Sequence, residues 1–254
     1  MILVVTEGER AEPALIEELV KLGCYGQHAE IVSYGTNIHT LIAALKSYVD
    51  SNDYKESDID LALVLKEIER KSQERPRNRN FDWEQKFSDI LMIFDLDPQD
   101  PNFRPQDVKW LVQHFCGDTT EGKIYINYPM FESLFLDEIK KVSKDVIERK
   151  GFFKEKMHQT KRWRKFQKLQ KSDNANRGEA ALSLRDVRDF LISHSCFYET
   201  ITNKEYLNSD MKELLECEMQ IWDSKNELIC INTSILSVLD FRSNFINQMQ
   251  REFS

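Results

Sequence analysis

The sequence predicts an α/β protein with a mostly parallel sheet flanked by helices. Two observations support this fold class. Short apolar runs of strand length alternate with stretches whose apolar residues recur at helical spacing, which is the pattern of a parallel sheet covered by helices. Glycine accounts for only 8 of the 254 residues. This is about half its usual share of ~7%, which argues against an all-β chain with many tight turns.

Two strand–helix units open the chain. Residues 2–6 (ILVVT) are apolar and largely β-branched, and 12–22 (EPALIEELVKL) follow with apolar residues at helical spacing. Pro13 falls in the first turn, where a helix tolerates proline. A second strand is expected at 29–34 and a second helix at 38–49. This order predicts parallel strands joined by helical crossovers.

An insertion is expected next, at 51–87, with an amphipathic helix at 56–75. The run 89–94 (DILMIF) is the strongest buried-strand signal in the chain. The other elements expected in this part are a helix at 105–116, a strand at 123–128 and a helix at 130–150. We therefore expect a core domain at 1–150, followed by a mainly helical extension at 151–254.

Composition and charge exclude several classes of protein. The net charge of −8 gives no overall positive field that would attract nucleic acid, and no apolar run approaches the ~18 residues of a membrane span. The N-terminus lacks the basic start and apolar stretch of a signal peptide. The five cysteines are widely spaced and form no C-x-x-C pair. We therefore expect a cytoplasmic protein with reduced cysteines and no membrane contact.

Two aspartates follow the buried run 89–94. Asp95 and Asp97 are two residues apart, so in an extended chain they face the same side. The carboxyl ends of parallel strands open onto the binding crevice of such a sheet. Carboxylate oxygens are the ligands that Mg²⁺ and Mn²⁺ prefer. The spacing therefore predicts a metal site, and the alternative is a solvated loop that begins with acids.

Three further acids are expected near the same edge of the sheet. Glu7 follows the first strand, beside Gly8, which permits a tight turn. Glu12 lies near the start of the first helix, and Glu132 lies just after the strand at 123–128. The alternative for both Glu12 and Glu132 is an acid that is favoured by the positive end of a helix.

Together these motifs resemble the Toprim domain of topoisomerases, primases and certain nucleases. A strand that ends in Glu-Gly at 4–8 (VVTEG) and an Asp-x-Asp at 93–97 (IFDLD) carry the resemblance. The stretch 7–13 (EGERAEP) is similar to the E-G-E-x-x-E-P opening of RloB-like abortive-infection Toprim proteins. The stretch 128–132 (YPMFE) resembles their N-P-x-F-E element, with Tyr128 in place of Asn and Asn127 one position earlier.

The resemblance implies a Toprim-like, Rossmannoid sheet over residues 1–150 and a bound Mg²⁺ or Mn²⁺ ion. Glu7 would be the general acid and base, while Asp95 and Asp97 would hold the cation. Glu12 and Glu132 would complete a second metal site, as in OLD-type nucleases. A divalent ion neutralises phosphate oxygens, orients an attacking water and stabilises the leaving oxygen.

A basic strip follows the core domain. Residues 140–171 contain 13 Lys or Arg against three acids, a local balance of +10. Basic residues alternate with aromatic ones in its densest part, which suits contacts with phosphates and stacking on bases. The residues expected to bind nucleic acid are Lys161, Arg162, Trp163, Arg164 and Lys165. The alternative is a solvated helix face that balances an acidic neighbour. Beyond the strip, one strand is expected at 227–231.

The resemblance implies a metal-dependent nuclease that hydrolyses phosphodiester bonds in RNA or DNA and takes part in anti-phage defence. Such proteins often act under the control of a partner ATPase, and this sequence carries no ATPase motif of its own. A homo-oligomer is a further partnership that the sequence leaves open. The alternative is a non-catalytic, Toprim-like regulatory subunit that binds a nucleic acid or a partner protein.

Overall fold

The computed structural model describes residues 1–52, 59–71, 81–136, 141–148, 160, 163–164 and 182–252. At its centre is a four-stranded sheet of β1 (Ile2–Thr6), β2 (Ala29–Ser33), β3 (Asp89–Asp95) and β4 (Lys123–Asn127). All neighbouring strands are parallel, and their order across the sheet is β2-β1-β3-β4. The predicted α/β fold class with a parallel sheet is confirmed.

The strands at the centre of the sheet are apolar on both faces. Every residue of β1 is buried, and so are the five central residues of β3. A parallel sheet is covered on both sides because its crossovers place helices on its faces. The carboxyl ends of β1, β3 and β4 therefore meet at one edge of the sheet, which is the edge that can remain open between the helices.

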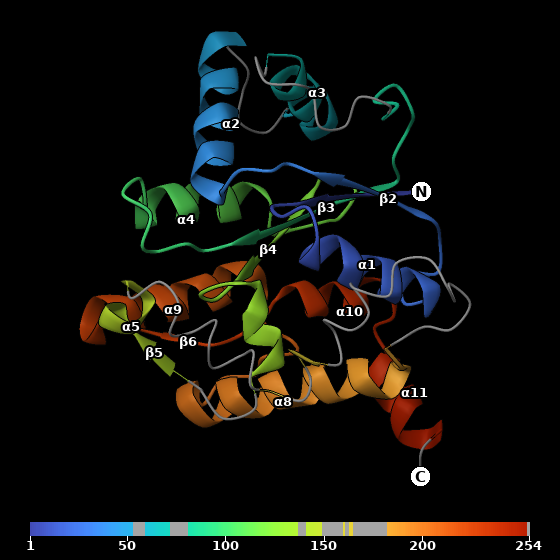
Figure 1. Cartoon of the computed structure of the whole chain (residues 1–254), viewed down its shortest axis with the longest axis vertical. Coiled ribbons are helices and arrows are strands. Elements are labelled where there is room, and N and C mark those ends of the chain that lie inside the picture. Colours follow the sequence, from blue (N-terminus) through green and yellow to red (C-terminus); the bar gives the residue numbers. More distant parts are fainter. Residues whose placement is uncertain are drawn as a thin grey trace.

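Helices cover both faces of the sheet (Figure 1). α2 (Ile38–Asn52), α3 (Leu61–Lys71) and α4 (Pro105–His114) lie on one side of it, and α1 (Ala11–Lys21) lies on the other. The first, second and fourth of the expected helices are confirmed. The helix expected at 56–75 begins later, at Leu61, because Asp60 accepts the Leu63 N–H at 3.0 Å and caps the start of α3; residues 56–58 and 72–75 lie outside the described residues.

The C-terminal extension is mainly helical within the described range 182–252. Its elements are α8 (Leu184–Thr202), α9 (Met211–Lys225), β6 (Glu227–Ile229), η3 (Ser234–Leu236), α10 (Ser237–Phe241) and α11 (Phe245–Glu252). In Figure 1, α8, α10 and α11 lie on the same side of the sheet as α1. The Tyr25 hydroxyl, just beyond α1, lies 2.9 Å from that of Ser237 in α10. Buried apolar residues of the sheet and the extension form one continuous core.

The helix expected at 130–150 is wrong. The described residues of this range form η2 (Phe131–Phe135), β5 (Lys141–Ser143) and α5 (Lys144–Glu148). η2 buries Phe131, Leu134 and Phe135, so the segment is fixed by core packing rather than by helical periodicity. β5 pairs in antiparallel fashion with β6, which covers the first part of the strand expected at 227–231. The partner that determines β5 therefore lies far along the chain.

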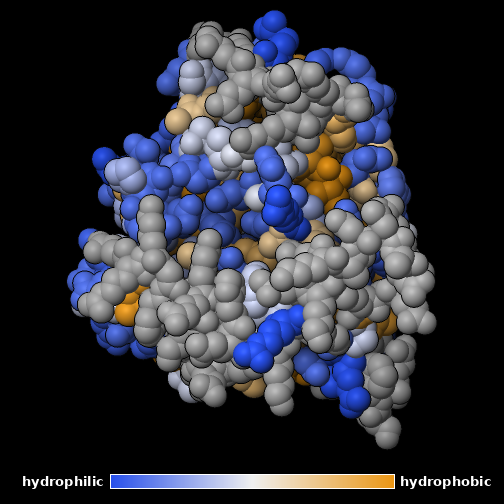
Figure 2. Space-filling view, in the orientation of Figure 1, coloured by the Kyte–Doolittle hydropathy of each residue, from blue (hydrophilic) through white to orange (hydrophobic). Residues whose placement is uncertain are grey.

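The described helices include none that is long and apolar enough to cross a membrane. Figure 2 shows that hydrophilic residues make up much of the described surface on the face drawn, with a smaller hydrophobic area below α3. Leu63 of α3 is 40% exposed, in contrast to the leucines of the sheet.

Replacing Leu91 by alanine is expected to lower the free energy of unfolding by about 2–5 kcal/mol, because Leu91 is fully buried in β3 and its loss leaves a cavity. Leu63→Ala removes the same atoms from an exposed position and is expected to change it by about 0.5 kcal/mol or less. Urea unfolding followed by circular dichroism measures both values. Equal costs at the two positions would contradict a core built around β3.

Candidate metal centre

The ends of β1 and β3 bring Glu7 and Asp95 together. The two strands are neighbours, with Thr6 opposite Ile93. The Glu7 N–H continues the ladder and donates to the Ile93 carbonyl at 3.0 Å. The Asp95 N–H in turn donates to Glu7 Oε2 at 3.1 Å. The two acids therefore meet at the carboxyl edge of the sheet, as the order of the elements predicts.

Asp97, Glu12 and Glu132 lie close to this pair. Asp97 is two residues beyond the end of β3, Glu12 is in the first turn of α1, and Glu132 is in η2. The carboxylates of all three raise the pKa values of both Glu7 and Asp95 by charge repulsion, which requires that they stand near them. Each of the three is therefore within electrostatic reach of the Glu7 and Asp95 pair.

Burial and repulsion by neighbouring acids raise the pKa values of both central carboxyl groups. Burial raises the pKa of Glu7 to about 8, with Asp97 as the next cause, while the hydrogen bond from the Asp95 N–H lowers it. Burial, followed by the charge of Glu7, raises the pKa of Asp95 well above its usual range. Among the described residues, no Lys, Arg or His side chain pairs with either group. Ionising both is therefore unfavourable without a cation.

Amide groups orient the two aspartates. Asn127 is the last residue of β4 and lies opposite Asp95, to whose Oδ1 its Nδ2 donates at 3.2 Å. Gln99 Nε2 donates to Asp97 Oδ1 at 2.8 Å. The Asn127 Oδ1 accepts from the Ser234 backbone N–H and hydroxyl at 3.3 and 3.2 Å. Sequence reasoning did not place Asn127 or Gln99 in the site; for Asn127 the available signal is its position at the end of a strand.

The chemistry of these donors fits a hard divalent cation. Carboxylate oxygens are its usual ligands, and a positive charge would relieve the repulsion that raises both pKa values. In the part of the chain that the structure describes, however, no three or more His, Cys, Asp or Glu side chains are arranged to hold a metal ion. Glu7, Asp95 and Asp97 each direct one oxygen at an N–H donor instead. Ligation of Mg²⁺ or Mn²⁺ therefore stays a prediction.

Gly8 leaves room for the side chain of Glu12. A Cβ atom at Gly8 would stand 2.5 Å from Glu12 Oε2, so even alanine would displace that carboxylate. The hydroxyls of Thr6 and Ser33 donate to the Gly8 carbonyl at 2.9 and 3.0 Å and hold the turn in place. An open hollow of about 440 Å³, lined by residues 7–12 and Gly35, lies at this turn. Gly8 therefore keeps Glu12 near the other acids.

Two of the five residues predicted to bind nucleic acid in the basic strip lie within the described residues, and one of them is buried. The members of the predicted set that lie outside the described residues are Lys161, Arg162 and Lys165. Arg164 is exposed, but Trp163 is only 5% exposed and its ring centroid lies 5.1 Å from that of Phe135. The prediction that Trp163 stacks on bases is therefore corrected. Its ring packs against η2 because burial of a large apolar ring outweighs its basic surroundings in the sequence.

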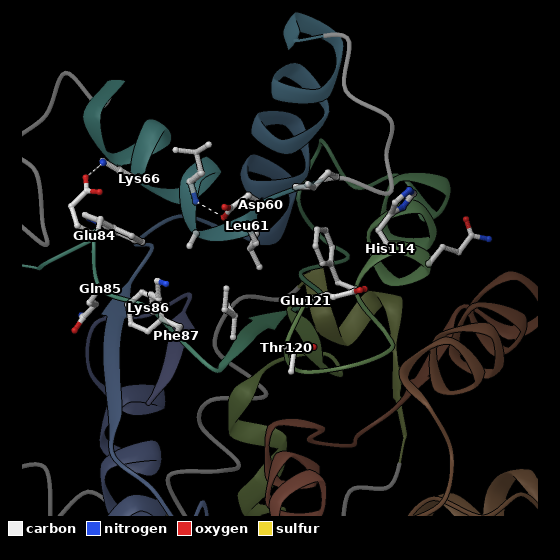
Figure 3. A pocket seen from close by; sticks show the side chains of 17 residues that line it. Asp60, Leu61, Lys66, Glu84, Gln85, Lys86, Phe87, His114, Thr120 and Glu121 are labelled. Carbon is white, nitrogen blue, oxygen red and sulfur yellow. Dashed lines mark hydrogen bonds and ion pairs between the residues drawn. The ribbon is translucent and has the colours of Figure 1, made fainter.

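A larger cavity, of about 1030 Å³, lies at the opposite end of the strands. It is lined by α3 and by residues around the starts of β3 and β4 (Figure 3). Lys66 on its wall pairs with Glu84, and neither is near the carboxyl edge. The predicted acids do not line this cavity. This cavity is therefore separate from the predicted site, although it is larger than the hollow at Gly8.

Replacing Glu7 by glutamine is expected to raise the melting temperature of the metal-free protein at pH 8, because it removes a buried charge that neighbouring acids repel. Folding raises the pKa of Glu7 from its ordinary value of 4.5 to about 8, so the wild type loses stability as the pH rises through this range. The gain in melting temperature should be absent near pH 4 and complete above pH 8. Each kcal/mol of folding free energy that the variant gains should raise the melting temperature by about 2–4 °C.

Thermal unfolding in EDTA over this range of pH measures the difference. Glu216→Gln is the matched control, because it removes an equal charge from an exposed position on α9. If the wild type melted above Glu7→Gln at pH 8, the repulsion inferred for Glu7 would be wrong.

Comparison with known proteins gives no relative: no protein-family model, no curated protein and no solved structure matches this chain. The resemblance to Toprim proteins therefore stays a prediction. It rests on short motifs and on the placement of their acids at the ends of neighbouring strands.

Proposed function

We propose that this chain is a Toprim-type nuclease that depends on Mg²⁺ or Mn²⁺ and hydrolyses phosphodiester bonds in RNA or DNA. The observation that carries the proposal is the meeting of Glu7 and Asp95 at the carboxyl edge of a parallel sheet, with three further acids within electrostatic reach. Carboxylates that repel one another in a buried place are unfavourable, and a bound cation offsets that cost. The motifs that resemble the Toprim domain contain the same acids in the same order along the chain.

In this proposal Asp95 and Asp97 hold the cation, with Glu12 and Glu132 beside them. The cation, when bound, neutralises phosphate oxygens and stabilises the leaving oxygen. Asn127 is a positioning residue, because its amide donates to one oxygen of Asp95 and leaves the other for ligation.

Glu7 takes the role of general acid and base. Its Oε2 atom accepts the Asp95 N–H, which leaves Oε1 to take up or release a proton. In the metal-free protein the pKa of this carboxyl group is about 8, and a bound cation would lower it toward the neutral range in which acid–base catalysis operates. One oxygen of Glu7 is thus held by a hydrogen bond while the other can transfer a proton, and this supports the role of general acid and base for Glu7.

The wider role that we propose is that of a cytoplasmic anti-phage effector controlled by a partner ATPase. Its support is the resemblance of 7–13 and 128–132 to abortive-infection Toprim proteins. The alternative is a non-catalytic regulatory subunit that binds nucleic acid or a partner protein. One observation favours it: the described carboxylates are not arranged as a ready-made group of metal ligands.

The purified protein is expected to cleave nucleic acid when Mg²⁺ or Mn²⁺ is present, and EDTA is expected to stop the cleavage. Glu7→Gln and Asp95→Asn should each lower the rate by about 10²–10⁴-fold, because they remove the proton carrier and a cation ligand. Total RNA and plasmid DNA are the substrates to compare, and Glu216→Gln should cleave as the wild type does. Cleavage that survives both substitutions or ignores EDTA would refute the assignment. Circular dichroism of each variant checks that the fold is retained.

Mn²⁺ is expected to raise the melting temperature of the wild type. An ion that binds only the folded state stabilises it by about 2.7 kcal/mol when its concentration is a hundred times Kd. Asp95→Asn should lose most of this rise, because it removes a ligand and the charge that attracts the ion. Differential scanning fluorimetry across a Mn²⁺ titration measures the shift. An equal rise in the wild type and in Asp95→Asn would place the cation elsewhere.

A further inference from the structure

A second hollow lies at the carboxyl edge of the sheet, beside the acids. It has a volume of about 550 Å³ and lies between the first turns of α2 and α4. Its polar lining residues are His39, Thr40, Lys46, Asn102, Arg104 and Asp107. We call it the Arg104 cavity. Its lining carries a net formal charge of +1, with histidine counted as neutral, in a chain whose net charge is −8.

The Arg104 cavity adjoins the candidate metal centre through the loop that carries Asp97. His39, which is only 7% exposed, places its Nε2 atom 3.3 Å from the Asp97 carbonyl oxygen. At the start of α2, Asn37 Nδ2 donates to Asp100 Oδ2 of the same loop at 2.6 Å. The loop after β3 therefore carries Asp97 and Asp100 and leads to Arg104, which lines the cavity.

Arg104 has N–H groups that remain available to bind a ligand. Its Nη1 atom donates to the carbonyl oxygens of Pro101 and Phe103 at 3.0 and 2.8 Å, which orients the guanidinium group. Among the described residues, no carboxylate pairs with Arg104. Its remaining N–H groups match the oxygens of a phosphate in number and geometry.

The other lining residues support an anion rather than a cation. Lys46 forms an ion pair with Asp107 at 2.6 Å, so the one carboxylate in the cavity is already neutralised. The side chain of Asn102 makes no hydrogen bond with the described residues and adds a neutral donor at the rim. A singly charged ligand that carries several acceptor oxygens fits this set of donors.

We propose that the Arg104 cavity binds a phosphate of a nucleic-acid strand, next to the phosphate that is cleaved. The inference rests on the proposed nuclease function, because the adjoining acids are what make a strand the relevant anion. Arg104 provides a charged hydrogen-bond fork, and Asn102 and Lys46 supply further donors. The cavity thereby holds the strand at a second point and sets its direction across the metal centre.

Binding of a short, fluorescein-labelled single strand, measured by fluorescence anisotropy with Ca²⁺ in place of Mg²⁺, tests the inference. Arg104→Ala should weaken binding about tenfold, as loss of a charged hydrogen bond does. It should also reduce the slope of log affinity against log salt by about 0.7, the value for one phosphate on a single strand. Lys109→Ala, which removes an exposed charge from the same helix outside the cavity, is the matched control and should change neither value.

A second variant keeps the test independent of the loop that Arg104 supports. Asn102→Asp adds a negative charge to the cavity and leaves the hydrogen bonds of Arg104 in place, so it should weaken binding to a similar degree. If both variants bind the strand as tightly as the wild type, the inference is overturned, whatever the cleavage assay shows. A free mononucleotide is the competitor to test. If it binds the wild type more tightly than the strand does, and displaces the strand from the wild type but not from Arg104→Ala, the cavity is a mononucleotide site and the inference is also overturned.

The outcome is distinct from that of the nuclease proposal. Wild-type protein that cleaves, together with Arg104→Ala that binds normally, removes only the cavity from the account. Wild-type protein that neither binds nor cleaves a strand removes both. Weaker binding by Arg104→Ala and Asn102→Asp, with Lys109→Ala unchanged, supports the cavity as a subsite for the strand.

Discussion

The crowding of buried carboxylates at one edge of the sheet is the constraint on which the rest of the structure depends. Glu7 and Asp95 are brought together by the pairing of β1 with β3, and burial together with the charges of neighbouring acids raises the pKa of both. Such an arrangement persists only if the surrounding structure over-determines it. Here the strands are buried along their whole apolar length, and a backbone N–H and an amide are aimed at the two acids. The stability of the core offsets the repulsion at its rim.

The C-terminal extension contributes to this rim although the motifs lie in the first part of the chain. Tyr128, just beyond β4, exchanges two backbone hydrogen bonds with Ile231, and the Thr233 hydroxyl donates to the Ile126 carbonyl at 2.8 Å. Ser234 donates to the Asn127 side chain, which itself holds Asp95. Changes in how the extension packs would therefore reach Asp95 through a short, continuous chain of hydrogen bonds.

The sequence was sufficient for the parts of the fold that depend on local pattern. The four strands follow from apolar runs, and the meeting of Glu7 with Asp95 follows from the rule that parallel strands end at one edge. The features that the sequence did not predict depend on contacts between residues that are far apart in the chain. β5 exists because β6 pairs with it, and Trp163 is buried because Phe135 receives its ring. Asn127 was overlooked because its motif position is shifted by one, whereas the register of β4 places it opposite Asp95.

Charge explains why a cationic cavity beside an acidic centre matters in an acidic protein. In this proposal, the carboxylates at the edge of the sheet would repel a phosphate when no metal ion is bound, whereas Arg104 and Lys46 would attract it. A bound divalent ion would reverse the sign of the centre and make it the second point of attraction. The strand and the ion would then each increase the affinity for the other, because thermodynamic coupling between two sites is reciprocal. Two separated points of positive charge also define a direction, which a uniformly basic surface does not. In this proposal, a protein of net charge −8 would bind a polyanion at defined points and in one orientation.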